Sequence, residues 1–246
     1  TTTSYIVTAI FIVNFFLSNK SELKISFNDF KLSTSLVGEI SALGSVTLAR
    51  QAMVSVVFLL VNNILYSSGG EATVAIYAII SRMVMFALFP VIGITQGFIP
   101  IVAFNYGSKN YKRVYDVVIK AVILSSFFAS AVFTLIFYFS EDIVNVFTND
   151  NKILNDTPAA MVWVFAATPI IGVQLIGAAY FQAIGKAIPA LLLTLTRQGF
   201  FFIPLLFVLS NKMGVIGVWL AFPLGELIAT IVTAIFLYRG LKKIII

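Results

Sequence analysis

Apolar residues along the chain are gathered into long runs, which short segments rich in polar residues and glycine separate. A helix needs about 20 apolar residues to cross a hydrocarbon core at about 1.5 Å per residue. The strands of a membrane barrel would instead alternate in pieces of about ten residues. The pattern therefore predicts an all-α, polytopic transmembrane helix bundle with full spans over Val37–Tyr66, Thr73–Phe104, Val114–Phe139, Pro158–Ile184, Ile188–Leu209 and Val215–Tyr238.

Two shorter segments precede these six spans. Tyr5–Leu17 is apolar but short for a membrane crossing, so residues 1–18 are interpreted as a partial transmembrane helix. Residues 19–36 mix lysines with acidic residues and predict an aqueous linker, which leaves residues 37–246 as the six-span bundle. Because the chain begins at Thr1, with neither an initiator methionine nor the features of a signal peptide, we expect a piece of a longer protein.

The composition supports a membrane protein and excludes several other classes. Hydrophobic residues make up 60% of the chain, charged residues only 11%, and the mean hydropathy is +1.02, whereas about a quarter of the residues of a soluble protein are charged. The net charge of +6 comes from short loops rather than from an amphipathic face, so we expect no nucleic-acid partner. The absence of cysteine and histidine removes thiol chemistry and the usual metal ligands. We expect neither an enzyme nor a cofactor or metal.

The basic residues also predict an orientation, because short loops rich in lysine and arginine stay on the cytoplasmic side of a membrane. We expect the protein to lie in the plasma membrane. The rule then places the linker, the loop after Phe104 and the C-terminus in the cytoplasm. One side of the predicted bundle holds Lys20, Lys24, Lys31, Lys109, Lys112, Arg113, Lys186, Arg239, Lys242 and Lys243, and the other only Lys152 and Lys212.

Charged and amide side chains inside the apolar spans are the candidates for a polar cleft, since a charge in a membrane is costly. Arg197 and Glu226 fall near the middle of adjacent spans and are able to pair. Such a pair has either a structural role, holding two helices together, or a direct role in transport. The other polar side chains fit helix packing through hydrogen bonds as well as they fit a cleft. The candidate set is Arg50, Gln51, Asn62, Arg82, Gln96, Gln182, Arg197, Gln198 and Glu226.

Prolines within the spans are candidate bending points. Proline removes an amide donor and clashes with the preceding turn, which produces a kink that is either static or a hinge. The hinge candidates are Pro90, Pro100, Pro169, Pro204 and Pro223.

Four stretches of sequence carry a resemblance to a known family. They read ARQAMVSVVFLLVNNIL, AIYAIISRMVMFALFPVIGITQGFIPIVAFNYGSKNYKRV, AAYFQAIGKAIPALLLTLTRQGFFFIPLLFVL and GVIGVWLAFPLGELIA. In this order, from about Ile40 to the C-terminus, the chain resembles the C-terminal half of multidrug and toxic compound extrusion (MATE) transporters of the bacterial multidrug efflux branch. The partial span would then be the sixth helix of a twelve-helix protein, and the bundle its helices seven to twelve.

The resemblance implies a transporter that exports organic cations in exchange for H⁺ or Na⁺ through alternating access between two six-helix lobes. The expected partners are the lipid bilayer, an N-terminal lobe of the same polypeptide and organic cations. Acidic residues that some family members use have no clear match in Glu39 or Asp156, so Glu226 is a candidate on its depth alone. Two alternatives remain. The first is a lipid-linked oligosaccharide flippase of the same wider superfamily, which the positive charges of Arg50, Arg82 and Arg197 support. The second is a membrane scaffold that does not transport.

Overall fold

The structure is a computed structural model that describes residues 2–18 and 33–245. Most of the predicted linker, residues 19–36, lies outside these ranges. The described residues are almost entirely helical and contain no strand, which confirms the predicted all-α class. The chain divides into two units, Thr1–Ser41 and Ala42–Ile246. The first unit contains α1 (Thr2–Leu17), a helix without buried residues, and the second contains the bundle.

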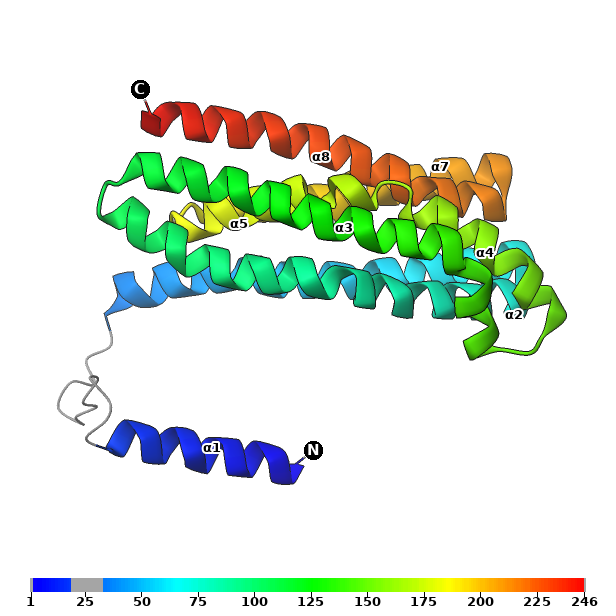
Figure 1. Cartoon of the computed structure of the whole chain (residues 1–246), viewed down its shortest axis with the longest axis horizontal. Coiled ribbons are helices and arrows are strands. Elements are labelled where there is room, and N and C mark those ends of the chain that lie inside the picture. Colours follow the sequence, from blue (N-terminus) through cyan, green and yellow to red (C-terminus); the bar gives the residue numbers. More distant parts are fainter. Residues whose placement is uncertain (1, 19–32, 246) are drawn as a thin grey trace. The chain divides into compact units, whose positions relative to one another are not determined.

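The longest helical element, α2 (Thr34–Gly107), consists of two antiparallel helices that meet at a sharp reversal (Figure 1). The reversal lies at Gly70, whose φ of 74° and ψ of −163° suit a residue without a β-carbon. The Thr73 hydroxyl donates to the carbonyl oxygens of Leu65, at 2.8 Å, and of Gly70, at 2.9 Å. These bonds join the two halves across the turn, so α2 contains both of the first two predicted spans.

The next helix, α3 (Tyr111–Phe147), continues eight residues beyond the predicted end of its span at Phe139. Asn110 caps its start, because its side chain accepts a hydrogen bond from the backbone N–H of Arg113. The helix bends at Phe139 and then runs through the acidic segment that suggested a loop. Ser140 and Val144 of that segment are buried four residues apart, so an apolar face holds the segment in helical form despite its charges.

The fourth predicted span is broken in the middle. It comprises α4 (Asn151–Phe165), the short 3₁₀ helix η2 (Thr168–Ile170) and α5 (Ile171–Ala183). Pro169 lies in η2, where its missing N–H and fixed φ interrupt the regular α-helical hydrogen bonds. The span is thus interrupted at the level of the proline.

The fifth predicted span is interrupted by a π-helical turn. It contains α6 (Ala187–Leu195), the π segment η3 (Thr196–Phe200) and α7 (Phe202–Met213), and α8 (Val215–Ile245) forms the last span. Four helical stretches of the described chain, kinks and breaks included, are long and apolar enough to cross a membrane: Thr34–Gly107, Tyr111–Phe147, Asn151–Ala183 and Val215–Ile244.

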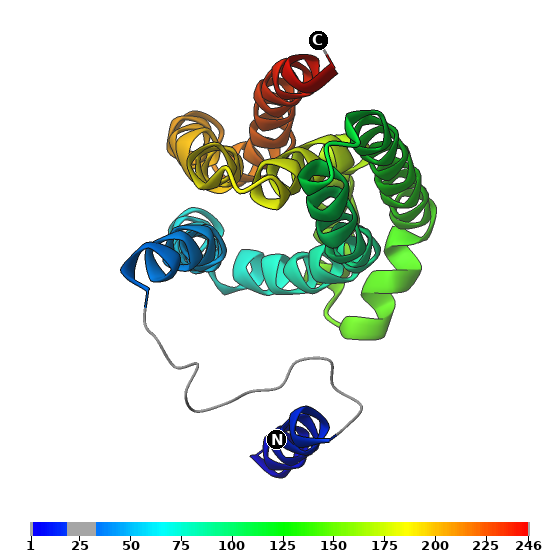
Figure 2. The same cartoon turned by 90° about the vertical axis from the view of Figure 1, so that its left-hand side faces the viewer.

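Two large apolar cores hold the bundle together, one toward each end of the helices. The first is built around Val61, Leu65, Ile80, Met161 and Leu206. The second, near the end where α8 finishes, is built around Val118, Ile176, Tyr180, Leu193 and Leu237. Large apolar side chains also cover the outside of the bundle, as expected of a surface in contact with lipid tails. Figure 2 shows the helices of the bundle seen end-on.

Candidate functional site

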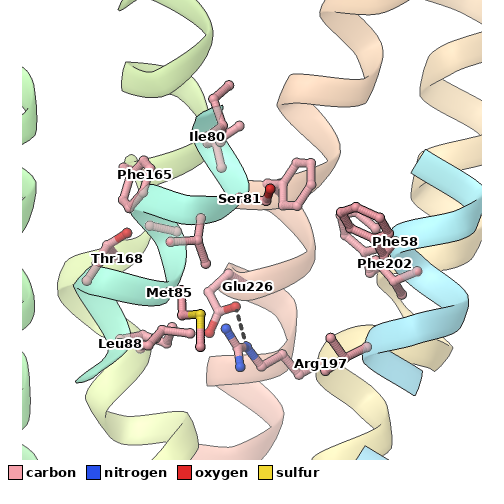
Figure 3. Close-up of a pocket in the computed structure, with 18 of the residues that line it drawn as sticks. Phe58, Ile80, Ser81, Met85, Leu88, Phe165, Thr168, Arg197, Phe202 and Glu226 are labelled. Atoms are coloured by element: carbon pink, nitrogen blue, oxygen red, sulfur yellow. Dashed lines mark hydrogen bonds and ion pairs between the residues drawn. The ribbon is translucent and has the colours of Figure 1, made fainter. Parts of the chain in front are cut away.

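A cavity of about 560 Å³ lies between the helices of the bundle. Both halves of α2, the end of α4, the region of η2, the π segment, α7 and α8 all contribute to its wall (Figure 3). Its polar lining residues are few. They are Gln51, Tyr77, Ser81, Thr168, Arg197 and Glu226, among a larger number of aliphatic and aromatic side chains.

Arg197 and Glu226 form an ion pair in this wall. The Arg197 Nε–H donates to Glu226 Oε2 at 2.9 Å, and the two side chains are 17% and 14% exposed. The second carboxylate oxygen, Oε1, is buried and has no hydrogen-bond partner among the described residues. The predicted pairing of these two residues is therefore present, and it leaves part of the carboxylate unsatisfied.

The π segment that carries Arg197 has an identifiable cause in the sequence. In a regular helix, residue 204 would donate its N–H to the carbonyl of Phe200, but Pro204 has no N–H and its ring clashes with that carbonyl. The turn before it widens, and the Phe201 N–H bonds to the Thr196 carbonyl at 3.4 Å instead. Such single wide turns are frequent at functional sites. Here the turn sets the direction in which Arg197 projects.

Aromatic rings line one part of the cavity. The Tyr77 ring centroid is 5.7 Å from that of Phe58 and 6.1 Å from that of Phe222, and Phe222 lies 4.7 Å from Phe202. These distances are typical of rings in contact. Aromatic faces attract organic cations through their quadrupole, so the wall combines such faces with one carboxylate.

The structure brings three of the predicted polar residues together at the cavity: Gln51, Arg197 and Glu226. Five of the others do not line it. Arg50, Arg82 and Gln96 are exposed on other faces of α2, Gln182 is half-buried near the end of α5, and Asn62 donates to the Phe58 carbonyl of its own helix at 2.7 Å. The side chain of Gln198 lies outside the described part of the chain.

The cavity also has lining residues outside the predicted set. On α2 they include Phe58 in the first half and Tyr77, Ser81 and Met85 in the second. The last three are spaced by four residues, as one face of a helix requires. Helical periodicity counted from an anchor such as Gln51 would have found Phe58, but nothing in the sequence marks which face of the second half is inward.

Two of the hinge candidates interrupt helices beside the cavity. Pro169 is flanked by the lining residues Thr168 and Ile171, and Pro204 follows the lining residue Phe202. The other three, Pro90, Pro100 and Pro223, lie inside helices that remain continuous. Whether any of the five acts as a hinge stays a prediction.

A group of buried polar atoms continues from the cavity along α8. Thr230 and Thr233 lie four and seven residues after Glu226, on the same face of the helix, and their hydroxyls have no hydrogen-bond partner among the described residues. Thr233 packs on Gly177 of α5, and the Tyr180 ring packs on Gly240. The Tyr180 hydroxyl is likewise buried and unpartnered within the described chain.

No three His, Cys, Asp or Glu side chains of residues 2–18 and 33–245 gather in a way that would hold a metal ion. The chemistry available in the cavity is therefore that of one carboxylate, one guanidinium, a few hydroxyl and amide groups and several aromatic rings.

Comparison with known proteins shows consistent similarity over nearly the whole chain. The family model MatE matches residues 47–208. The multidrug export protein MepA of Staphylococcus aureus (strain NCTC 8325 / PS 47) is 26% identical over 243 residues, which are 97% of this chain and 52% of that protein. MepA of Staphylococcus saprophyticus is 24% identical over 240 residues, again with 97% and 52% coverage.

Solved structures agree with the sequence relatives. A structure of the MATE multidrug transporter DinF-BH superimposes with a TM-score of 0.83 at 32% identity, covering 94% of this chain and 52% of that one. An outward-facing multidrug resistance MATE family transporter of the MOP superfamily reaches 0.90 at 21% identity, covering 97% and 54%. The chain thus spans about half the length of the relatives it matches.

Proposed function

Because the chain belongs to the MatE family of membrane transporters, we propose that it forms the C-terminal lobe of an antiporter that exports organic cations in exchange for H⁺ or Na⁺. The observation that carries this proposal is the 560 Å³ cavity, in which an ion pair with one unsatisfied carboxylate oxygen faces an aromatic and aliphatic wall. The family is one of transporters, so the chain is not an enzyme, as expected. The residues that bind the substrate and the coupling ion are part of the proposal.

In the proposed mechanism, substrate and coupling ion compete for Glu226. While the carboxylate is charged, its pair with Arg197 is neutral overall, and the free oxygen Oε1 attracts a cation lying against the aromatic rings. A proton on Glu226 removes the negative charge and leaves Arg197 as a net positive charge, which repels the cation. A Na⁺ ion would bind the same carboxylate oxygen, a ligand that hard cations prefer. One site thus holds either substrate or coupling ion, as exchange requires.

A proton that reaches Glu226 from outside must leave toward the cytoplasm. The hydroxyls of Thr230, Thr233 and Tyr180 lie between Glu226 and the end of the bundle where α8 finishes, which is the predicted cytoplasmic side. Buried hydroxyls without partners are able to pass a proton or to hold water molecules that do so. We assign the coupling proton to this route.

The mechanism also needs a change in the lobe that opens the cavity to alternate sides. A ligand shifts such an equilibrium only if it binds the two states with different affinity. Pro169 and Pro204 interrupt helices directly at the cavity wall, so bending at either one would move Thr168 or Arg197 relative to Glu226. These two prolines are the proposed hinges.

The test of the site uses the full-length transporter that contains this lobe. Efflux of a fluorescent organic cation and the accompanying proton movement are measured for Glu226→Gln and Arg197→Ala, with Glu141→Gln, an exposed acid on α3, as the matched control. We expect Glu226→Gln to abolish the proton release that accompanies substrate addition and to reduce efflux at least tenfold. Unchanged efflux at equal expression in both cavity variants would remove the pair from the mechanism.

The cavity does not favour the flippase alternative. A pyrophosphate head group calls for several unpaired cations, and Arg50 and Arg82 do not line the cavity. Arg197 does line it, but Glu226 neutralises its charge.

A further inference from the structure

A second cavity, of about 1160 Å³, opens on the outside of the bundle, remote from the first one. It is a groove whose sides are the first three turns of α3 and the last three turns of α8, with Val173 of α5 on its floor. The start of α3 and the end of α8 lie beside each other at this end of the bundle (Figure 2). None of the residues that line the central cavity lines this groove.

One end of the groove is basic. Lys109 and Lys112 line it from the start of α3 and Lys242 from the end of α8, against a single acid, Asp116. The first turn of α3 adds the partial positive charge of a helix N-terminus. This end therefore carries an excess of positive charge and suits an anionic group such as a phosphate.

Tyrosines surround the basic end. Tyr111 and Tyr115 of α3 and Tyr238 of α8 line the groove, and Tyr238 is largely exposed. Tyrosine is enriched where a membrane protein passes from the hydrocarbon to the headgroup layer, because its ring is apolar and its hydroxyl polar. The combination of lysines and tyrosines places this end of the groove at the level of the lipid headgroups.

The rest of the groove is apolar and runs deep. It continues along Ile119 and Val122 of α3 and along Leu237 and Ala234 of α8. From Tyr111 to Val122 the α3 side extends about 16 Å at about 1.5 Å per residue. The headgroup layer is only about 5–7 Å thick on each side of a bilayer. A free anion would occupy the basic end alone, whereas a lipid tail fills the remaining length.

We propose that this groove is a binding site for one anionic glycerophospholipid of the cytoplasmic leaflet. Its phosphate lies against Lys109, Lys112 and Lys242, and one acyl chain lies between α3 and α8 over Val173. The leaflet follows from the orientation predicted from the basic loops. By filling the groove between the two helices on the outside of the bundle, the lipid stabilises the lobe at the end where the proposed proton route leaves it.

The test is native mass spectrometry of the purified full-length protein after removal of bound lipid. The protein is titrated with phosphatidylglycerol and, in parallel, with phosphatidylcholine of the same chains. We expect retention of phosphatidylglycerol over phosphatidylcholine. The double variant Lys112→Gln/Lys242→Gln should lose this preference by about fivefold for each lysine, the usual contribution of an interfacial lysine to binding an anionic lipid.

Two further variants separate the charge from the groove. Lys152→Gln/Lys212→Gln makes the same change in charge at the opposite end of the bundle and should leave retention unchanged. Ala234→Phe fills the apolar part of the groove while keeping every lysine and should weaken phosphatidylglycerol retention. Melting temperatures measured in detergent without lipid check that all variants fold.

Three results would overturn the proposal: equal retention of the two lipids, insensitivity to both groove variants, or displacement of phosphatidylglycerol by millimolar inorganic phosphate, which would mean that the tail contributes nothing. None of these measurements depends on transport. The lipid site can therefore be refuted without refuting the proposed antiport, and the reverse also holds.

Discussion

At the scale of single residues, the balance of charge between Arg197 and Glu226 governs the cavity. Both side chains lie near the middle of apolar spans and are mostly buried, where an unpaired charge is strongly unfavourable. The 2.9 Å contact neutralises both but satisfies only one carboxylate oxygen. The ion pair is stable, but one carboxylate oxygen of Glu226 lacks a hydrogen-bond partner among the described residues. This carboxylate is therefore suited to bind a cation or a proton in turn.

This balance predicts that the pair is more tolerant of losing both charges than of losing one. Glu226→Gln or Arg197→Gln alone should lower the free energy of unfolding by about 3 kcal/mol, because each leaves its partner buried and unpaired. The double variant should lose less than the sum of the single losses. A double-mutant cycle of denaturant unfolding in detergent measures the difference. Additive losses would show that the two charges do not interact in the folded protein.

The unpartnered hydroxyl of Thr233 leads to a second prediction at this scale. Thr233→Val keeps the shape of the side chain and removes a buried polar atom that has no partner among the described residues, so the free energy of unfolding should stay unchanged or rise by about 1 kcal/mol. Coupled proton movement should slow if the hydroxyl belongs to the route from Glu226. Stopped-flow measurement with a pH-sensitive dye in proteoliposomes gives the rate.

A matched control for this prediction is Thr157→Val. Thr157 is also fully buried, but its hydroxyl donates to the Ile153 carbonyl at 2.6 Å. This variant should lose stability and leave the proton rate unchanged. If instead Thr233→Val destabilises the protein while its rate of proton movement stays normal, the Thr233 hydroxyl has a structural role.

At the scale of elements, the local geometry of the fifth span positions Arg197. The span is α-helical before Thr196 and after Phe201, and the wide turn between them precedes the proline that cannot complete the hydrogen bonds. The third span shows the converse case, in which an acidic stretch after Phe139 stays helical because Val144 is fully buried. In the third span, packing against neighbouring helices keeps a charged segment helical. In the fifth span, the missing N–H of a proline interrupts a segment that is otherwise apolar and helical.

We therefore expect Pro204→Ala to restore a regular helix and to disturb the cavity. The new N–H at residue 204 is able to bond to the Phe200 carbonyl, which removes the reason for the wide turn and rotates Arg197 away from Glu226. Efflux should fall about tenfold, which corresponds to about 1.4 kcal/mol in the barrier. Efflux assays with the full-length transporter at equal expression test this expectation.

Pro90→Ala is the control for the variant at residue 204. Pro90 lies in a part of α2 that is continuous and helical, and its replacement should affect efflux less. If both variants transport equally well, the wide turn has no role in positioning Arg197.

At the scale of the whole molecule, the helices alternate in direction so that their connections lie at two ends of the bundle. The reversal at Gly70, the loop at residues 148–150 and the turn at Gly214 lie at one end, while the loop around Lys109, the turn at Gly185 and the C-terminus lie at the other (Figure 1). This arrangement agrees with the distribution of basic residues that predicts the cytoplasmic side. The orientation itself stays a prediction.

The absence of cysteine from this chain offers a direct test of orientation. The single variants Lys152→Cys and Lys212→Cys should react in intact cells with a thiol reagent that cannot cross membranes. The variants Lys109→Cys and Lys186→Cys should react only after the cells are opened. Native cysteines elsewhere in the full-length protein are first replaced by serine. The reverse labelling pattern would invert the predicted topology and, with it, the leaflet of the proposed lipid site.

What the sequence determined by itself is the presence of apolar helices long enough to cross a membrane and the pairing of Arg197 with Glu226 by depth. Both depend on local quantities, the length of an apolar run and the distance of a charge from its ends, and these are readable along a single segment. Of the five prolines named from the sequence, two mark breaks, at Pro169 and beside Pro204, and the other three lie inside continuous helices.

Only the tertiary structure decided which faces of those helices point inward. Arg50 and Gln51 are neighbours in sequence, yet only Gln51 lines the cavity, and Tyr77 joins the wall without any mark in the sequence. The rotation of a helix about its axis is set by packing against several other helices at once. Because lipid tails are as apolar as the side chains of a span, the sequence of the span does not show which face points inward and which faces lipid. The composition of the cavity wall, and the groove between α3 and α8, follow from that packing.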